Sequence, residues 1–266
     1  MSRQTITSAK WLTRTFQFIS LFILFVFASQ DLNAEGWRKL APGIEYQDLD
    51  GNLLTPWSHI HAFRINLKEN RLSVVTAADL SREHASVNEY AQHTNALITI
   101  NGGFFDNDYK PLGLRIDNKR QTSPLKNISW WGIFFIKNQK AYLTNVYQFR
   151  SNNSVDFAIQ SGPRLLINSR IPPLKPGRAE RSALGITHDG RIIILVTDNL
   201  PLSTTELAQL MKAPPLNCQN ALNLDGGSSS QLKAQLPSFQ LEVHGFSNVS
   251  DAIIVKPRHS NYMTDN

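Results

Sequence analysis

The stretch NLDGGSSS, residues 223–230, ends an apolar run with a carboxylate, two glycines and three hydroxyl groups. A strand that stops at Asp225 places this carboxylate at the edge of a sheet, and glycine lets the backbone turn sharply and approach a ligand closely. Serine hydroxyls and turn amides suit an oxyanion or the hydroxyls of a sugar. Because a plain turn does not need all of these groups together, we interpret the stretch as a ligand site.

A second stretch, NGGFFD at residues 101–106, follows another apolar run at 96–100. A Ser-x-x-Glu pattern, which is the capping-box signature of a helix start, precedes both stretches at 86–89 and 203–206. Each half therefore predicts a helix, a connection, a strand, a polar residue and Gly-Gly. We hypothesise an internal pseudo-twofold duplication whose two turns converge on one cleft. The alternative is a coincidence of common helix and turn signals.

Alternating and β-branched runs dominate the rest of the chain, and such runs are typical of strands. The pattern predicts only two helices, at 87–94 and 204–212. The expected fold class is α+β, with mostly antiparallel or mixed sheet and few helices. Besides the run at 96–100, strands are expected at 60–67, 72–76, 112–117, 130–136, 140–145, 154–160, 164–167, 183–187, 192–197, 221–225, 239–243 and 252–255.

The first residues resemble an export signal. Three basic residues precede an apolar stretch at 15–28, which is short for a membrane span and suits a signal segment. We expect a signal peptide over 1–34, cleaved after Ala28 or Ala34, although an uncleaved anchor stays open. One domain is expected over 35–256, followed by a mobile tail at 257–266. The protein is therefore expected to be periplasmic or secreted, with no later membrane span.

The formal charge of the whole chain is +6, and the basic residues are not clustered. This distribution argues against nucleic acid as a partner. The single cysteine, Cys218, allows no internal disulfide and is interpreted as a buried small apolar residue.

Six segments in one order carry a resemblance to a known family. They are 101–106, 160–166, 181–185, 196–198, 223–227 and 249–255. Over about residues 70–255 the chain resembles the phosphodiester glycosidases, and its departures place it in the bacterial branch. Ser228 stands where many members have a third glycine, and Asp198-Asn199-Leu200 replaces a common Asp-Gly-Arg. A substrate-contacting arginine of the family is therefore expected to be missing.

The resemblance implies hydrolysis of the bond between an anomeric carbon and a phosphodiester oxygen. A phosphate leaves without a strong general acid, so cations and amide donors that stabilise its charge matter more. The cationic sugar carbon needs a carboxylate nearby. The residues assigned to catalysis are Asp225, Asp106, Asn101 and Arg181. The residues assigned to substrate binding are Gly102, Gly103, Gly226, Gly227, Ser228, Ser229, Asp198 and Gln160.

Each candidate also has a structural interpretation. Asp225, Asp106 and Asn101 could shape turns, because short polar side chains bond to nearby backbone. Arg181 could be a solvated cation at the rim. The oxygens of Asn101, Asp106 and Asp225 suit Mg²⁺ or Ca²⁺, but neither ion is favoured, and no His or Cys spacing suggests zinc. We therefore expect no cofactor.

A Ser–His–Asp hydrolase is disfavoured, because the order Gly-Gly-Ser-Ser is not the G-x-S-x-G nucleophile elbow. Trp130 or Phe104 could stack on a sugar ring. We hypothesise an exported hydrolase that cleaves a sugar-1-phosphodiester in envelope or extracellular glycan material. The alternatives are a non-catalytic carbohydrate-binding module and a phosphodiesterase that cuts the P–O bond. The expected partner is a glycan or a sugar phosphate.

Overall fold

The computed structural model describes residues 36–49, 55–151 and 154–258. The signal peptide with its two cleavage sites, and the tail beyond residue 258, lie outside these residues and stay predictions. Across the described ranges, no helix combines the length and the apolar character needed to cross a bilayer.

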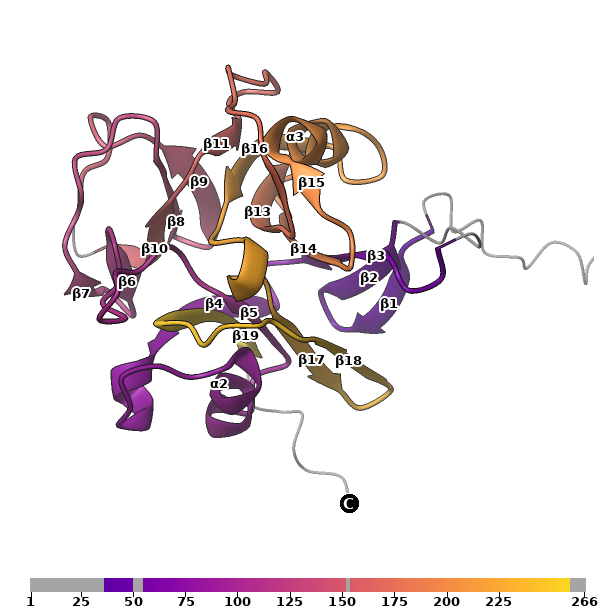
Figure 1. The fold of residues 1–266 in the computed structure, drawn as a ribbon, viewed down its shortest axis with the longest axis horizontal. Helices are drawn as coiled ribbons and strands as arrows, with labels where there is room; N and C mark the ends of the chain where they lie inside the picture. Colours follow the sequence, from indigo (N-terminus) through magenta and orange to yellow (C-terminus); the bar gives the residue numbers. More distant parts are fainter. Residues whose placement is uncertain (1–35, 50–54, 152–153, 259–266) are drawn as a thin grey trace, which may run out of the picture. The chain divides into compact units, whose positions relative to one another are not determined.

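A seven-stranded sheet carries the second Gly-Gly turn (Figure 1). Every pairing in it is antiparallel, so alternate strands end at the same edge. In spatial order the strands are β1 (Arg38–Ala41), β2 (Ile44–Asp48), β3 (His59–Ile65), β14 (Ile192–Asp198), β13 (Ser182–Thr187), β16 (Cys218–Asn223) and β11 (Arg164–Leu166).

Two five-stranded antiparallel sheets and a short strand pair complete the strands of the described residues. The sheet with the first Gly-Gly turn has the order β18 (Phe239–Val243), β17 (Leu232–Leu236), β5 (Ile98–Asn101), β19 (Asp251–Pro257) and β4 (Asn70–Thr76). The other has the order β7 (Arg120–Ser123), β6 (Arg115–Asp117), β10 (Val155–Ser161), β8 (Gly132–Lys137) and β9 (Lys140–Thr144). The pair is β12 (Arg178–Ala179) with β15 (Leu202–Ser203).

One apolar core lies among the inner faces of the three large sheets. It takes alternate residues from each, for example Ile194 and Val196 of β14, Phe157 and Ile159 of β10, and Ile253 of β19. Side chains in a strand alternate between faces, so this core accounts for the alternating runs of the sequence. The same rule directs the residues between them to the outer faces.

The two α-helices of the described chain pack on the outer faces of two of the three sheets. Helix α2 (Val87–Thr94) packs on the sheet of β5, and α3 (Thr204–Lys212) packs on the seven-stranded sheet. Both begin with a complete capping box, at Ser86 with Glu89 and at Ser203 with Glu206. The predicted helices and caps are confirmed, and so is the α+β class with mostly antiparallel sheet. Each predicted repeat is therefore a helix on a sheet, and the two sheets share one core.

Several strands were not predicted from the sequence: the hairpin of β1 and β2 at residues 38–48, β7, the pair of β12 and β15, and β17. Of these, β17 has the sequence LKAQL. Its central residues, Lys, Ala and Gln, do not favour a strand, so local composition does not predict β17. Its alternate residues Leu232, Ala234 and Leu236 lie in the core, and this burial determines the strand.

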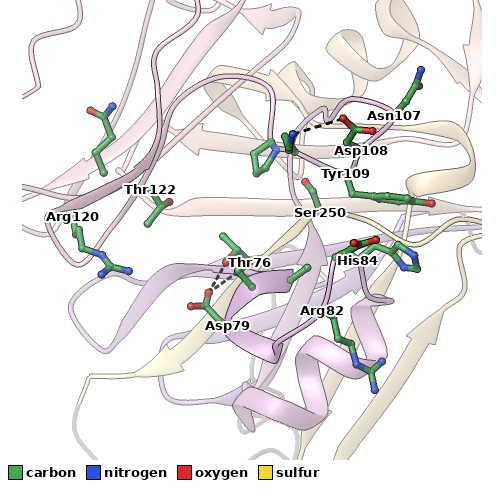
Figure 2. Close-up of a pocket in the computed structure, with 16 residues that line it drawn as sticks. Thr76, Asp79, Arg82, His84, Asn107, Asp108, Tyr109, Arg120, Thr122 and Ser250 are labelled. Carbon is green, nitrogen blue, oxygen red and sulfur yellow. Dashed lines mark hydrogen bonds and ion pairs between the residues drawn. The ribbon is translucent and has the colours of Figure 1, made fainter.

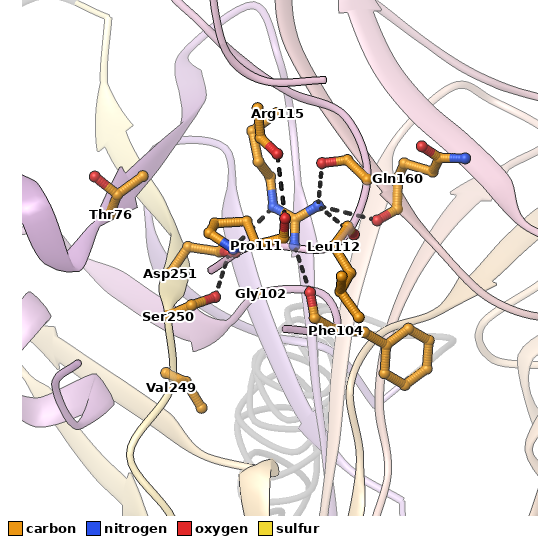
Figure 3. Close-up of polar contacts among 12 residues, drawn as sticks. Thr76, Gly102, Phe104, Pro111, Leu112, Arg115, Gln160, Val249, Ser250 and Asp251 are labelled. Atoms are coloured by element: carbon orange, nitrogen blue, oxygen red, sulfur yellow. Dashed lines mark hydrogen bonds and ion pairs between the residues drawn. The ribbon is translucent and has the colours of Figure 1, made fainter. Parts of the chain in front are cut away.

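A buried ion pair joins two of the sheets. Nε of Arg115, in β6, lies 3.1 Å from Oδ2 of Asp251 at the start of β19, and neither side chain is exposed. The remaining guanidinium nitrogens of Arg115 donate to main-chain carbonyls, including those of Gln160 at 3.1 Å and Phe104 at 3.4 Å (Figure 3). The carbonyl of Asp251 accepts the N–H of Gly102 at 2.9 Å. The pair therefore holds the first Gly-Gly turn against β10 and β19.

We expect Asp251→Asn to destabilise the fold by about 3–5 kcal/mol, because it leaves the Arg115 charge buried without a counter-ion. Chemical denaturation of the purified protein measures this change. Asp108→Asn is the matched control, since Asp108 pairs with Lys110 at 3.7 Å and both side chains are 75% exposed. Its effect should stay within about 0.5 kcal/mol. Equal midpoints and slopes for Asp251→Asn and the wild type would contradict the role of the pair.

Candidate active site

The two Gly-Gly turns meet, as predicted. The side-chain amide of Asn101 donates to the carbonyl of Asp225 at 2.8 Å, and the N–H of Asp225 donates to the carbonyl of Gly102 at 3.2 Å. Oδ1 of Asn101 accepts hydrogen bonds from the Ser182 hydroxyl at 2.7 Å and from the N–H of Gln231 at 3.2 Å. Asn101 is fully buried, so it fixes the turns to each other.

Asp225 is a partly buried carboxylate just beyond the end of β16. Its Oδ1 accepts the N–H of Gly226 at 3.0 Å, and the Ser229 hydroxyl also bonds to the carboxyl group. Burial raises the pKa of Asp225, and the charge of Asp251 adds to this rise, whereas Ser229, Gly226 and Arg115 oppose it. The carboxyl group is therefore in a weakly solvated environment with few donors.

The turn after Asp225 lies against the segment that leads into β13. The N–H of Gly227 donates to the carbonyl of Glu180 at 2.8 Å, and a Cβ on Gly226 would come within 2.8 Å of that carbonyl. Gly227 has a φ of 63°, which favours glycine. Ser229 of the short helix η3 (Gly227–Ser229) is buried, whereas Ser228 is exposed and its carbonyl accepts from Phe246 and Ser247.

Arg181 lies beside this turn, and its guanidinium bonds to main-chain carbonyls. Its Nε donates to the carbonyl of Leu202 at 2.8 Å and its Nη2 to the carbonyl of Gly177 at 2.7 Å. Its Nη1 would lie 3.8 Å from a Cβ on Gly226. Burial lowers the pKa of Arg181, and within the described residues no carboxylate pairs with it. A partly buried positive charge is thus held next to the Asp225 turn.

The structure places other predicted residues in supporting positions. Gln160 is fully buried, and its side chain bonds to the backbone of Leu114 and Lys126. A Cβ on Gly102 would overlap Asp251, and one on Gly103 would lie 2.7 Å from Nη2 of Arg115. A side chain at either glycine would therefore collide with a member of the buried ion pair. A direct contact of these residues with substrate stays a prediction.

Asp106 and Asp198 do not join Asp225 through any contact between the described residues. Oδ1 of Asp106 accepts the N–H groups of Asp108 at 3.0 Å and Lys110 at 2.9 Å, so this oxygen shapes a turn. Oδ1 of Asp198 accepts from the Asn199 side chain at 3.0 Å at the end of β14. Their catalytic and binding roles also stay predictions.

Sequence reasoning did not assign a role to Arg164 at the start of β11. Arg164 is the first residue of β11, and Arg181 directly precedes β13; these two strands flank β16, which ends shortly before Asp225. Burial is the cause that lowers the pKa of Arg164, and in the parts of the chain that are described it has no ion pair. The only sequence feature that could have pointed to Arg164 is its place as the one charged residue of an otherwise apolar strand, RLL.

A cavity of about 950 Å³ borders the buried ion pair at Ser250, whose hydroxyl donates to Asp251 at 2.8 Å (Figure 2). Most of the residues that line it are polar or charged, and none of them is a predicted catalytic or substrate-binding residue. Arg120 and Thr122 lie across it from Asp108 and Tyr109. No group of three or more His, Cys, Asp or Glu side chains in the described residues is placed to hold a metal ion.

Solved structures share this fold. A protein from Synechocystis matches with a TM-score of 0.62 and 18% identity over 84% of this chain, which spans 63% of that protein's length. The zebrafish N-acetylglucosamine-1-phosphodiester alpha-N-acetylglucosaminidase catalytic domain, auto-inhibited by its pro-peptide, matches with a TM-score of 0.60 and 19% identity. That match covers 84% of this chain and 87% of the zebrafish chain.

Sequence comparison extends these similarities. The uncharacterized protein YigE of Escherichia coli K12 is 28% identical over 193 residues, which are 66% of this chain and 75% of YigE. The model of the phosphodiester glycosidase family matches residues 94–256, a range that includes both Gly-Gly turns, Arg164 and Arg181. The chain therefore belongs to the phosphodiester glycosidase family.

Proposed function

We propose that this protein is an exported hydrolase that cleaves a sugar-1-phosphodiester between the anomeric carbon and the bridging oxygen. One observation carries the proposal. Asp225 is a partly buried carboxylate where two Gly-Gly turns meet, and Arg181 lies beside the next residue, Gly226, without an acidic partner in the described residues. A carboxylate and an uncompensated cation at one place suit the two charges that this reaction develops.

The charges of the reaction assign a role to each group. Departure of the phosphodiester leaves positive charge on the anomeric carbon, and the Asp225 carboxylate would stabilise it or attack it. The leaving oxygen becomes negative, and a guanidinium with fixed N–H groups stabilises that charge without a proton transfer. Weak solvation of Asp225 strengthens its interaction with the developing cation, because fewer water molecules screen it.

Family membership supports the proposed substrate class, and the N-terminal sequence supports export. The zebrafish relative is named for removing N-acetylglucosamine from a phosphodiester, so N-acetylhexosamine 1-phosphodiesters are the first substrates to test. The basic residues and apolar stretch of residues 1–28 support export, and envelope or extracellular glycan would then be the accessible material.

We expect Asp225→Asn to lower turnover of a sugar-1-phosphodiester by about 10²- to 10⁴-fold, measured as release of reducing sugar. The fold should be retained.

The stability of this variant follows from the pKa of Asp225, which burial raises. The Asp225 carboxyl group contributes stability that is fully present below its unfolded pKa and is lost as pH rises through its folded pKa. At neutral pH the melting temperature of the variant should thus equal or exceed that of the wild type, with a difference that shrinks on acidification. Unchanged turnover would remove Asp225 from the mechanism.

We expect the rate to rise with pH along an acid limb whose pKa lies above 3.8, the ordinary value for aspartate, because Asp225 acts in its ionised form. Ser229→Ala removes a hydrogen bond that lowers this pKa, so the limb should move to higher pH. Ser228→Ala is the matched control and should leave the limb in place, since Ser228 is exposed and does not bond to the carboxyl group. A limb that moves to lower pH in Ser229→Ala would contradict this assignment.

Hydrolysis in water enriched with heavy oxygen separates the proposed reaction from its alternatives. We expect the label in the released sugar, which reports cleavage of the C–O bond. Label in the phosphate would instead assign a phosphodiesterase that cuts the P–O bond. Tight glycan binding without turnover, with Asp225→Asn changing affinity alone, would assign a binding module.

A further inference from the structure

The hydrolase proposed above needs a second carboxyl group near Asp225. Most glycosidases use two, of which one stabilises or attacks the anomeric carbon and the other moves protons. Asp106, which sequence analysis assigned to catalysis, has no contact with Asp225 among the described residues, and its Oδ1 shapes a turn. Glu180 is a carboxyl group at the edge of the seven-stranded sheet where Asp225 lies, and sequence analysis gave it no role.

The main chain of Glu180 contacts the Asp225 turn, since its carbonyl accepts the N–H of Gly227 at 2.8 Å. Glu180 lies two residues before β13, and β13 lies between β14 and β16 in the sheet. Because neighbouring strands are about 5 Å apart, carboxyl groups on two adjacent segments at this edge lie about 5–10 Å apart. A separation of about 6.5–9.5 Å leaves room for a water molecule between two carboxyl groups. The strand spacing therefore suits a water molecule held between Glu180 and Asp225.

The Glu180 side chain lies near Asp198, on the side of the sheet where the Gly-Gly turns meet. Its carboxyl group accepts the N–H of Asn199, and the charge of Asp198 acts on its pKa. Asp198 is two residues after Val196, which lies in the core between the sheets, so both face the same side. Ser182 also faces this side, since its hydroxyl bonds to the first Gly-Gly turn. The Glu180 carboxyl group is therefore on the face of the sheet that carries the candidate site.

No cation pairs with the Glu180 carboxyl group in the described residues. Of the two arginines nearest to it in the sequence, Arg178 pairs with Glu206 at 2.6 Å, and Arg181 donates to main-chain carbonyls. Burial raises the pKa of Glu180, and the charge of Asp198 adds to this rise. A partly buried carboxylate without a counter-ion is unfavourable for stability, and such groups gather at functional sites.

We propose that Glu180 is the general base that takes a proton from the water molecule attacking the anomeric carbon. This role rests on the proposed function. The bond from the anomeric carbon to the bridging oxygen breaks, and its electron pair stays on the phosphate. The water oxygen forms the new bond to the carbon, and one of its protons passes to the Glu180 carboxylate and from there to solvent. The products are a free sugar and a phosphate monoester.

Glu180→Gln tests this role, because glutamine keeps an acceptor for Asn199 and cannot take a proton. With a sugar-1-phosphodiester that the wild type hydrolyses, we expect kcat to fall by about 10²- to 10⁴-fold and KM to change by less than about threefold. The matched control is Glu83→Gln, since Glu83 is exposed and lines the separate cavity. Its turnover should equal that of the wild type.

Added azide identifies the step that Glu180→Ala has lost. Azide attacks a sugar carbon without giving up a proton, so it can replace water where no base is present. We expect sodium azide to raise turnover of Glu180→Ala by about tenfold or more and to yield a glycosyl azide. Sodium chloride at the same concentration should do neither.

The pH profile gives a readout that a structural role would not change. Asp225 and Glu180 both act in their ionised forms, so the logarithm of the rate should rise with pH at a slope of about two in the wild type and about one in Glu180→Gln. Asp198→Asn removes a negative charge beside Glu180, so the limb should move to lower pH. His59 lies opposite Asp198 and pairs with Asp48 at 2.7 Å, so its own charge is largely offset.

Melting curves separate loss of the base from loss of the fold. Because burial raises the pKa of Glu180, its carboxyl group contributes stability that is fully present below the unfolded pKa and is lost as pH rises through the folded pKa. At neutral pH, Glu180→Gln should therefore melt at the temperature of the wild type or above it. A slow variant that is as stable as the wild type supports the base.

The outcomes distinguish this proposal from the hydrolase itself. A wild type that hydrolyses no sugar phosphodiester would overturn the hydrolase and the base with it. Wild-type turnover in Glu180→Gln, beside an inactive Asp225→Asn, would overturn the base alone. Slow turnover of Glu180→Gln with no rescue of Glu180→Ala by azide and an unchanged slope of the acid limb would assign Glu180 a structural role, and would also overturn the base.

Discussion

The buried pair of Arg115 and Asp251 is the constraint on which the site depends. Removing two charges from water is expensive, and further hydrogen bonds have to offset the cost. Arg115 donates to carbonyls of the Phe104 turn and of β10. Oδ2 of Asp251 accepts from Arg115 and Ser250, its buried Oδ1 has no partner in the described residues, and its main-chain carbonyl holds the N–H of Gly102. The pair thus positions the first Gly-Gly turn, which in turn receives the N–H of Asp225. Its charges also act on the protonation of Asp225.

Several residues that sequence analysis assigned to catalysis or to substrate binding also have structural roles. Asn101 fixes one turn to the other, Gln160 holds the loop at Leu114 and Lys126, and Gly102 leaves room for Asp251. The charges near the junction then include the Asp225 carboxylate, which has few donors, and Arg181, which has no acidic partner among the residues that the structure describes. A site of this composition favours ligands that carry their own negative charge, because such a ligand supplies the missing partner of the cations.

The sequence predicted those features whose signals are local. Both helices were predicted with their bounds because a capping box and an apolar face lie within a few residues of one another. The convergence of the Gly-Gly turns followed from their repeated context. The roles of Arg115 and Asp251 could not be predicted in this way. Asp251 is 136 residues from Arg115, and the two lie in different sheets, so only the packing of these sheets reveals that they meet.

The hydrogen bond from Asn101 to Asp225 closes a span of 124 residues and joins two sheets. Closing a loop of this length costs chain entropy before the contact repays it, so such contacts slow folding. The pairings inside the sheets close loops as long, since Thr76 of β4 pairs with Asp251 of β19 and Ile65 of β3 pairs with Ile192 of β14. Completion of the sheets and closure of the junction therefore demand the same distant parts of the chain, and a truncation that removes β19 would deprive both of a partner.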